Sequence, residues 1–205
     1  MAKFSVLLDA CVLVPFTLAD TLLRQAEADL YRPLWSRKIL EEVQSAVERV
    51  HPDLEEEFVR RRIAGMERAF PDARVAGWEP LVAALDLPDP DDRHVLAAAI
   101  RGRADLIVTN NLKDFPATAL EVWEIEVQSA DEFLLNQLDL YPEEVTNALE
   151  RQALATKKPP LTLLQILEGL KRCDVGRFAD AARERLNRDV PPPSPATFAP
   201  PLFEW

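Results

Sequence analysis

Two short apolar runs constrain the fold of this chain more than any other feature of its sequence. Residues 4–8 end at Asp9, and residues 104–109 end before a stretch of asparagines and charged residues. Apolar runs of this length are typical of strands that are buried on both faces of a parallel sheet. The segments between them have helical periodicity, so the sequence predicts an α/β fold with a central parallel sheet.

The helical segments carry recognisable start and stop signals. Ser36 is placed to cap a helix over residues 36–50, whose apolar side chains recur at helical spacing. A second amphipathic helix is predicted over residues 54–70, and a small-sided one over residues 93–101, ended by Gly102. Residues 121–127 alternate in polarity and are predicted to form a third strand.

The character of the chain changes after residue 135. Residues 142–155 and 161–187 are helical in pattern, whereas residues 191–205 hold 6 of the 17 prolines and several aromatic side chains. Prolines at this density exclude a helix or a central strand. We therefore divide the chain into an α/β domain over 1–135, a helical extension over 136–189 and an extended tail over 190–205. The tail is either disordered or a strap whose aromatic side chains dock on this protein or on a partner.

Composition excludes several classes of protein. With 48% hydrophobic and 29% charged residues, the chain is typical of a soluble globular protein, and no apolar run reaches the ~20 residues that cross a membrane. The first residues lack a signal peptide, so we expect a cytoplasmic protein. Two cysteines are too few for a disulfide scaffold or a structural zinc site, and two histidines leave little for histidine-based catalysis. The net charge of −11 argues against a broad basic surface that grips nucleic acid.

Most of the excess negative charge lies in the first part of the chain. Residues 1–135 contain 25 acidic and 15 basic side chains, whereas residues 136–205 contain 10 and 9. Most of these acids are expected to form a solvated surface. A few occupy positions that solvation does not explain, because ligands of parallel sheets bind at the carboxyl ends of the strands.

Acids and amides far apart in the sequence are predicted to converge there. The candidates are Asp9 and Asn111 after the two strands, Asp114 beyond Asn111, Asp92 at a helix start, and Glu42 on the helix over 36–50. Neighbouring carboxylates repel each other unless a cation lies between them. Hard oxygen ligands of this kind suit Mg²⁺ or Mn²⁺. Taken one at a time, each of these residues is equally explained as part of a turn, a helix cap or the solvated surface.

Four sequence blocks, taken together and in this order, resemble the PIN-domain ribonuclease family, and VapC-like toxins of bacterial toxin–antitoxin pairs in particular. The blocks are Val-Leu-Leu-Asp-Ala-Cys-Val-Leu at 6–13, Ile-Leu-Glu-Glu-Val at 39–43, Asp-Asp-Arg-His-Val-Leu-Ala-Ala-Ala at 91–99, and Ile-Val-Thr-Asn-Asn-Leu-Lys-Asp-Phe at 107–115. The resemblance covers about residues 4–135. It implies a PIN-like three-layer α/β/α fold, to which the C-terminal helices and the Pro-rich tail are added.

The resemblance also assigns roles to the residues. Asp9 is similar to the family's first metal-binding aspartate, Glu42 fits the helix glutamate better than Glu41, and Asp92 fits the third acid. The fourth acid usually stands two residues after the strand-end threonine, where this chain has Asn111. An asparagine ligates a hard cation through its carbonyl oxygen but brings no charge. Asp114 either supplies the missing carboxylate or braces the turn.

The implied activity is metal-dependent hydrolysis of RNA phosphodiester bonds, with Mg²⁺ or Mn²⁺ held by Asp9, Glu42, Asp92, Asn111 and Asp114. Arg93 and Lys113 are the substrate-binding candidates, with Arg101 and Arg103 nearby in sequence, and the Thr109 hydroxyl is expected to support a ligand. The implied partners are an RNA substrate, a cognate antitoxin and a second copy of the chain. Two alternatives stay open: a weak or inactive PIN domain that serves as a binding module, and a PIN nuclease without an antitoxin.

Two further residues near these motifs are expected to be structural. Cys11 comes two residues after Asp9, and continuation of the strand would turn it into the core on the opposite side. His94 lies in the first turn of the helix that follows Asp92, where a packing role is favoured over contact with substrate.

Overall fold

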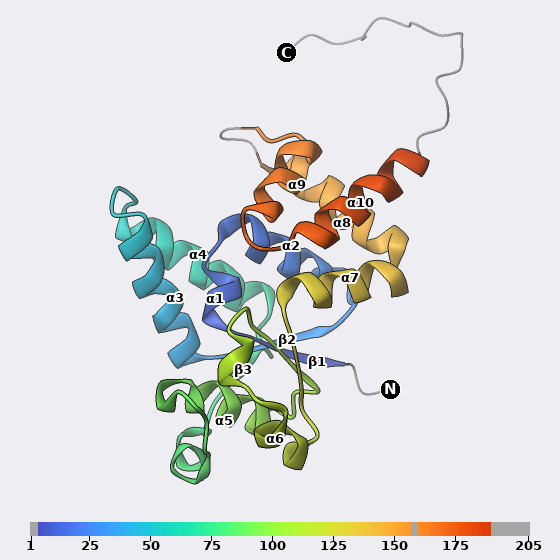
Figure 1. The fold of residues 1–205 in the computed structure, drawn as a ribbon. Helices are drawn as coiled ribbons and strands as arrows, with labels where there is room; N and C mark the ends of the chain where they lie inside the picture. Colours follow the sequence, from blue (N-terminus) through green and yellow to red (C-terminus); the bar gives the residue numbers. More distant parts are fainter. Residues whose placement is uncertain (1–3, 157–159, 190–205) are drawn as a thin grey trace, which may run out of the picture.

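A single parallel sheet organises the protein (Figure 1). The computed structural model describes residues 4–156 and 160–189, so the predicted tail over 190–205 lies outside the described residues. The strands are β1 (Ser5–Leu8), β2 (Arg32–Ser36), β3 (Arg74–Val75), β4 (Leu106–Val108) and β5 (Glu126–Gln128), in the spatial order β3–β2–β1–β4–β5. The parallel sheet expected from the apolar runs is confirmed, and β1 lies at its centre.

Helices cover both faces of this sheet. In the described part of the chain they are α1 (Ala10–Leu13), α2 (Phe16–Glu27), α3 (Arg37–Val50), α4 (Glu56–Ala69), α5 (Arg93–Gly102), α6 (Ala117–Leu120), α7 (Ala130–Leu140), α8 (Pro142–Ala155), α9 (Leu163–Lys171) and α10 (Gly176–Asp189). In Figure 1, α5 lies on one side of the sheet, and α2 and α7 lie on the other with α8, α9 and α10 beyond them. The predicted three-layer α/β/α fold with a C-terminal helical extension is therefore confirmed. None of the described helices is long and apolar enough to cross a membrane.

Strand β2 was not predicted, because Pro33 argues against a central strand. The N–H of Arg32 donates to the Phe4 carbonyl of the β1 side, whereas the N–H of Trp35 donates to the Ala73 carbonyl on the β3 side. The nitrogen of Pro33 therefore faces the β3 side, and the β2–β3 pairing starts only at Trp35. The N–H that Pro33 lacks would therefore point to a place where β2 has no hydrogen-bonded neighbour strand. Ser36 ends this strand and caps α3 as expected, accepting a 3.1 Å hydrogen bond from the Ile39 N–H.

The third strand was predicted too long. Residues 121–123 form a 3-10 turn, and only Glu126–Gln128 pair with β4. Glu124, in the left-handed region at φ 54°, ends the turn, and the Val122 side chain is 74% exposed. The alternation of polarity at 121–125 therefore did not mark a buried face.

The close approach of α5 to the sheet requires its last residue to be glycine. A Cβ atom on Gly102 would lie 2.8 Å from Val75 Cγ2 and 3.1 Å from Leu34 Cδ1. Arg103, which follows at φ 54°, ends the helix in the left-handed conformation. The tight packing here sets the position of α5 against β2 and β3, and so fixes where the N-terminus of α5 meets the strand ends.

The C-terminal helices are tied to the sheet domain by buried polar contacts. Gln152 of α8 accepts a 2.8 Å hydrogen bond from Thr21 and donates a 3.0 Å one to the Thr17 carbonyl, both on α2. Asp131 of α7 accepts from the Phe178 N–H of α10 at 2.8 Å and pairs with Arg177 at 2.6 Å. Helix α7 runs through the domain boundary predicted at residue 135, and that division of the chain stays a prediction.

Candidate metal centre

Strand pairing places the first acid of the site. Leu8 of β1 is in register with Val108 of β4, so the next residues, Asp9 and Thr109, lie side by side at the carboxyl ends of the strands. The Thr109 hydroxyl donates a 2.7 Å hydrogen bond to Asp9 Oδ2, and the Ala10 N–H donates a 2.6 Å one to Asp9 Oδ1. Both side chains are buried. The Asp9 carboxylate is therefore held by one strand end and by the start of α1.

Cys11 belongs to this site, which the sequence analysis missed. The chain turns into α1 directly after Asp9, so the Cys11 thiol folds back and donates to Asp9 Oδ2 over 3.2 Å. The Asn110 N–H donates to the Cys11 sulfur over 3.2 Å. Burial, with a smaller contribution from the Asp9 charge, raises the pKa of Cys11 to about 12. The thiol therefore keeps its proton and acts as a donor, because a thiolate beside Asp9 would be repelled.

Three more carboxylates meet where the start of α5 approaches the turn after β4. One oxygen each of Asp89, Asp92 and Asp114 lies within 4.8 Å of the others. Asp89 caps the 3-10 turn over Pro90–Asp92, and Asp114 ends the turn over Leu112–Asp114, where its side chain is buried. Asp89, which the sequence analysis did not name as a ligand, also belongs to this cluster.

The pKa of Asp92 depends on its burial and on the charges of three nearby acids. Burial raises its pKa most, and the charges of Asp9, Asp89 and Asp114 raise it further, to about 6, against a small opposing effect of His94. Asp9 is thus close enough to Asp92 to act on it electrostatically. The four aspartates form one region of negative potential in which adding a full charge is unfavourable.

Asn111 and Lys113 lie beside the cluster. The Asn111 side-chain amide donates a 3.1 Å hydrogen bond to Asp92 Oδ2, and the Asn111 N–H donates to the Thr109 hydroxyl over 3.1 Å. Lys113 is largely exposed, with Nζ 3.9 Å from Asp114 Oδ2. In this structure Asn111 therefore acts as a donor that joins the two halves of the site.

Glu42 contacts a different set of groups. Its Oε1 lies 2.9 Å from His94 Nε2 and 3.3 Å from Lys38 Nζ. Burial alone would raise the pKa of Glu42, but the hydrogen bonds and charges of His94 and Lys38 outweigh it and hold the pKa below its ordinary value. Glu42 is not one of the three acids whose oxygens lie within 4.8 Å of one another. It contacts the start of α5 through the buried side chain of His94.

The predicted cationic residues divide into two groups. Arg93, the first residue of α5, lies beside the acid cluster and pairs with Asp86 over 3.3 Å. Arg101 and Arg103 lie at the other end of this helix, at Gly102, about 13 Å along its axis. The structure therefore keeps Arg93 and Lys113 near the site and places Arg101 and Arg103 away from it.

The donor set of this centre fits a hard divalent cation. Its groups are carboxylate oxygens of Asp9, Asp89, Asp92 and Asp114, with the side-chain oxygen of Asn111 available if the amide turns over. Mg²⁺ and Mn²⁺ prefer oxygen ligands, whereas zinc favours thiolate and imidazole nitrogen, and the neutral Cys11 thiol does not offer such a ligand. The mutual repulsion that raises the pKa of Asp92 is also what a bound cation would relieve.

Comparisons with known proteins match two stretches of the chain to two family profiles. A family profile described as "PIN domain" matches residues 5–113, and one described as "VapC50 C-terminal domain" matches residues 130–184. The chain is 44% identical over 107 residues to a protein of Mycobacterium tuberculosis named "Putative ribonuclease VapC50". That alignment covers 52% of this chain and 62% of the relative. No solved structure matches the chain.

Proposed function

We propose that this chain, which belongs to the PIN-domain family, is an endoribonuclease that hydrolyses RNA phosphodiester bonds with Mg²⁺ or Mn²⁺. The observation that carries the proposal is the cluster of Asp89, Asp92 and Asp114, whose carboxylate oxygens lie within 4.8 Å of one another and close enough to Asp9 for its charge to act on Asp92. The name of the Mycobacterium tuberculosis relative, a ribonuclease, supports the same activity.

The four aspartates would hold the cation. We assign Asp9, Asp92 and Asp114 as its principal ligands, because Asp9 and Asp114 are buried and both act on Asp92. Asp114 then supplies the carboxylate that is missing at Asn111. A bound Mg²⁺ or Mn²⁺ would stabilise the negative charge that develops on the scissile phosphate. Asp89, at the exposed side of the cluster, is placed to ligate a second cation or to hold water.

The remaining residues prepare the site. Thr109 and Cys11 donate to the same oxygen, Asp9 Oδ2, and so leave the carboxylate in one orientation. Glu42 is the candidate to accept a proton from an attacking water, and its contact with His94 keeps it ionised at neutral pH. Arg93 and Lys113, at the rim, would bind the phosphates on either side of the scissile bond. The acidic surface of residues 1–135 favours a single-stranded RNA, because it offers no extended basic surface to a duplex.

A second candidate function rests on Asn111. This residue stands where the family usually has an acid, and its neutral amide donates to Asp92 over 3.1 Å, so the site carries one carboxylate fewer. A site with less charge binds a cation more weakly, so this contact favours a weak or inactive PIN domain that serves as a binding module. A PIN nuclease that works without an antitoxin would share the catalytic prediction and differ only in its partner.

Incubation of the full chain with a labelled single-stranded RNA pool, with Mg²⁺, with Mn²⁺ or with EDTA, tests the activity. We expect cleavage with either cation and none with EDTA. Asp9→Asn should reduce cleavage by more than the 10–100-fold that loss of an outer-shell partner typically costs. Asp91→Asn, which neutralises an exposed acid beside the cluster, is the matched control and should cleave as the unmodified chain does.

Three outcomes would contradict the proposal. Cleavage in EDTA would exclude the metal, and cleavage that persists in Asp9→Asn would exclude the assigned site. Absence of cleavage with either cation, while Mn²⁺ still binds to the protein, would favour the binding module.

We include a cognate antitoxin, a homodimer and a cytoplasmic location in the proposal, because the resemblance to VapC-like toxins implies them. A small reading frame for a DNA-binding protein directly upstream of the gene would support the antitoxin. Light scattering of the purified chain, alone and with that protein, would measure both assemblies.

A further inference from the structure

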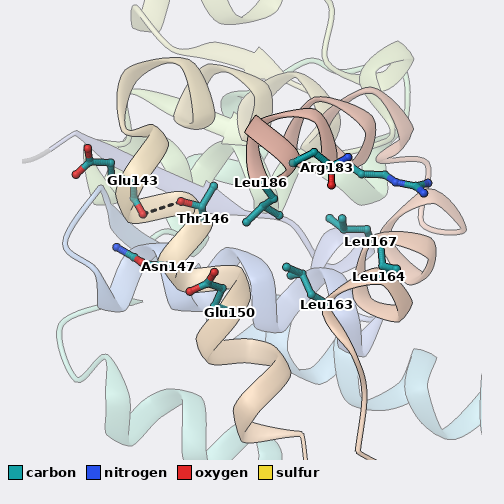
Figure 2. A pocket seen from close by; sticks show the side chains of 10 residues that line it. Glu143, Thr146, Asn147, Glu150, Leu163, Leu164, Leu167, Arg183 and Leu186 are labelled. Atoms are coloured by element: carbon teal, nitrogen blue, oxygen red, sulfur yellow. Dashed lines mark hydrogen bonds between the residues drawn. The ribbon is translucent and has the colours of Figure 1, made fainter. Parts of the chain in front are cut away.

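A groove remote from the acid cluster lies among the three C-terminal helices. Figure 2 shows Leu163, Leu164 and Leu167 of α9 facing Leu186 of α10 across an open space, with α8 as the third wall. The cavity has a volume of about 550 Å³, within the range of sites that bind small molecules or peptide side chains. The Leu164 side chain is 56% exposed, which is unusual for a leucine that faces other leucines.

The polar groups of this groove are arranged at its rim. Arg183 of α10 and Asn147 of α8 are both exposed and offer hydrogen-bond donors, whereas the exposed Glu143 and Glu150 of α8 offer carboxylate acceptors. Thr146 directs its hydroxyl to carbonyls of its own helix. The groove therefore combines an apolar floor with donors and acceptors at its edge. Such a surface suits an apolar segment whose polar groups stay at the rim.

Residues 190–205 of the same chain have that chemistry. Six of these residues are prolines, which have a carbonyl but no N–H. Four are large and apolar, namely Phe198, Leu202, Phe203 and Trp205. The one charged side chain, Glu204, is acidic and would pair with Arg183 of α10, across the groove from Glu143 and Glu150 of α8. A Pro-rich segment also prefers an extended conformation before it binds, so it loses little freedom on docking.

The attachment point of the segment favours docking within one chain. Leu186 and Asn187 line the groove, and the segment begins at residue 190, three residues after Asn187. Sixteen residues at ~3.1 Å each reach about 50 Å when extended. The segment is therefore long enough to return to the groove from its attachment point. A short tether gives an effective concentration of about millimolar, which a separate protein with equal contacts reaches only at a high concentration in solution.

We propose that the groove between α8, α9 and α10 is the docking site of the chain's own residues 190–205, whose aromatic side chains lie on the leucines of α9 and α10. The docked segment covers Leu164 and brings Glu204 to Arg183. Docking also fastens α9 to α10, because the segment contacts both helices.

Photo-crosslinking of the full chain tests this proposal. A photoreactive phenylalanine analogue is incorporated at position 203, and the products are separated by mass and mapped by mass spectrometry. We expect crosslinks within one chain to residues 163–167 or 183–187. Leu164→Glu should lower the yield of these crosslinks about tenfold, which corresponds to about 1.4 kcal/mol of lost docking energy.

The control is Leu154→Glu, on α8. Leu154 is 80% exposed and does not line the groove, so this change adds the same charge to the same helical layer without touching the segment. Both variants change exposed side chains and should unfold at the temperature of the unmodified chain. A second readout is hydrogen exchange of α9 amides, which Phe203→Ser combined with Trp205→Ser should accelerate severalfold.

Each other outcome overturns the proposal. Crosslinks between two chains would assign the groove to a second copy, and crosslinks outside the groove would assign the segment elsewhere. Equal yields in Leu164→Glu and Leu154→Glu, or unchanged exchange of α9 in the double serine variant, would show that the segment does not dock there.

Discussion

Neutralising Asp92 should stabilise the protein when no cation is bound. The change Asp92→Asn removes the carboxyl whose pKa rises from its ordinary value of 3.8 to about 6, through burial and the charges of Asp9, Asp89 and Asp114. A rise of that size corresponds to about 3 kcal/mol of unfavourable free energy in the folded state at neutral pH. Asp92 is only half-buried, so solvent screens the repulsion and we expect about 1 kcal/mol.

The sign of the effect follows from the direction of the shift. A carboxyl with a raised pKa in the folded state is unfavourable once it is ionised, so the penalty is absent below pH ~4, grows as the pH rises through about 6 and is complete above it. The variant should therefore gain about 1 kcal/mol at pH 7.5, or about 2–4 °C in melting temperature for a chain of this size. At pH 5 the gain should fall to about half.

Urea denaturation in EDTA at pH 7.5 and pH 5 measures this difference. Asp91→Asn is the control, because that acid is exposed and should change stability by less than ~0.5 kcal/mol. Added Mn²⁺ should stabilise the unmodified chain and stabilise Asp92→Asn less, since binding to the folded state alone raises stability. A variant that is less stable at pH 7.5, or whose gain is the same at pH 5, would refute the electrostatic argument.

Three further changes test other parts of the structure. Cys11→Val should lower Mn²⁺ affinity about tenfold, measured by calorimetry, whereas Cys11→Ser keeps a donor to Asp9 and should bind as the unmodified chain does; equal losses in both would exclude the hydrogen bond. Gly102→Ala should cost about 1–3 kcal/mol in urea denaturation, because the new Cβ would lie 2.8 Å from Val75 Cγ2. Gln152→Ala should cost about 1–2 kcal/mol in the same assay, since α8 loses two hydrogen bonds to α2 while the Thr21 hydroxyl keeps the Thr17 carbonyl as acceptor; no loss would mean that α8 is held by apolar packing alone.

Much of the fold follows from local pattern. The runs that form β1 and β4 are buried along their whole length, and Ser36 caps α3, because short apolar runs and capping side chains depend on neighbours in the sequence. Strand β2 was missed because the direction of the Pro33 nitrogen matters only once the neighbouring strands are in place. The short β5 was overestimated because alternation does not tell whether either face is covered.

The candidate site shows the same division. The positions of Asp9, Asp92 and Asp114 at strand ends and a helix start are readable from the sequence, as is the scarcity of cysteine. That Asp89 joins Asp92 and Asp114, and that Glu42 contacts His94, depends on where α3 and α5 lie against the sheet. No spacing along the chain encodes these contacts.

The sequence by itself therefore determined that β1 and β4 are buried strands of a parallel sheet, and it pointed to Asp9, Asp92 and Asp114 as acids near its carboxyl edge. Only the tertiary structure decided how these acids share their charge, that the Cys11 thiol supports Asp9, and that three C-terminal helices enclose a groove. The physical reason is the separation along the chain over which each interaction acts. Periodicity and capping act over one or two turns of chain, whereas the acid site needs segments about 100 residues apart to meet, as Asp9 and Thr109 do. The groove likewise forms only when three separate helices pack together.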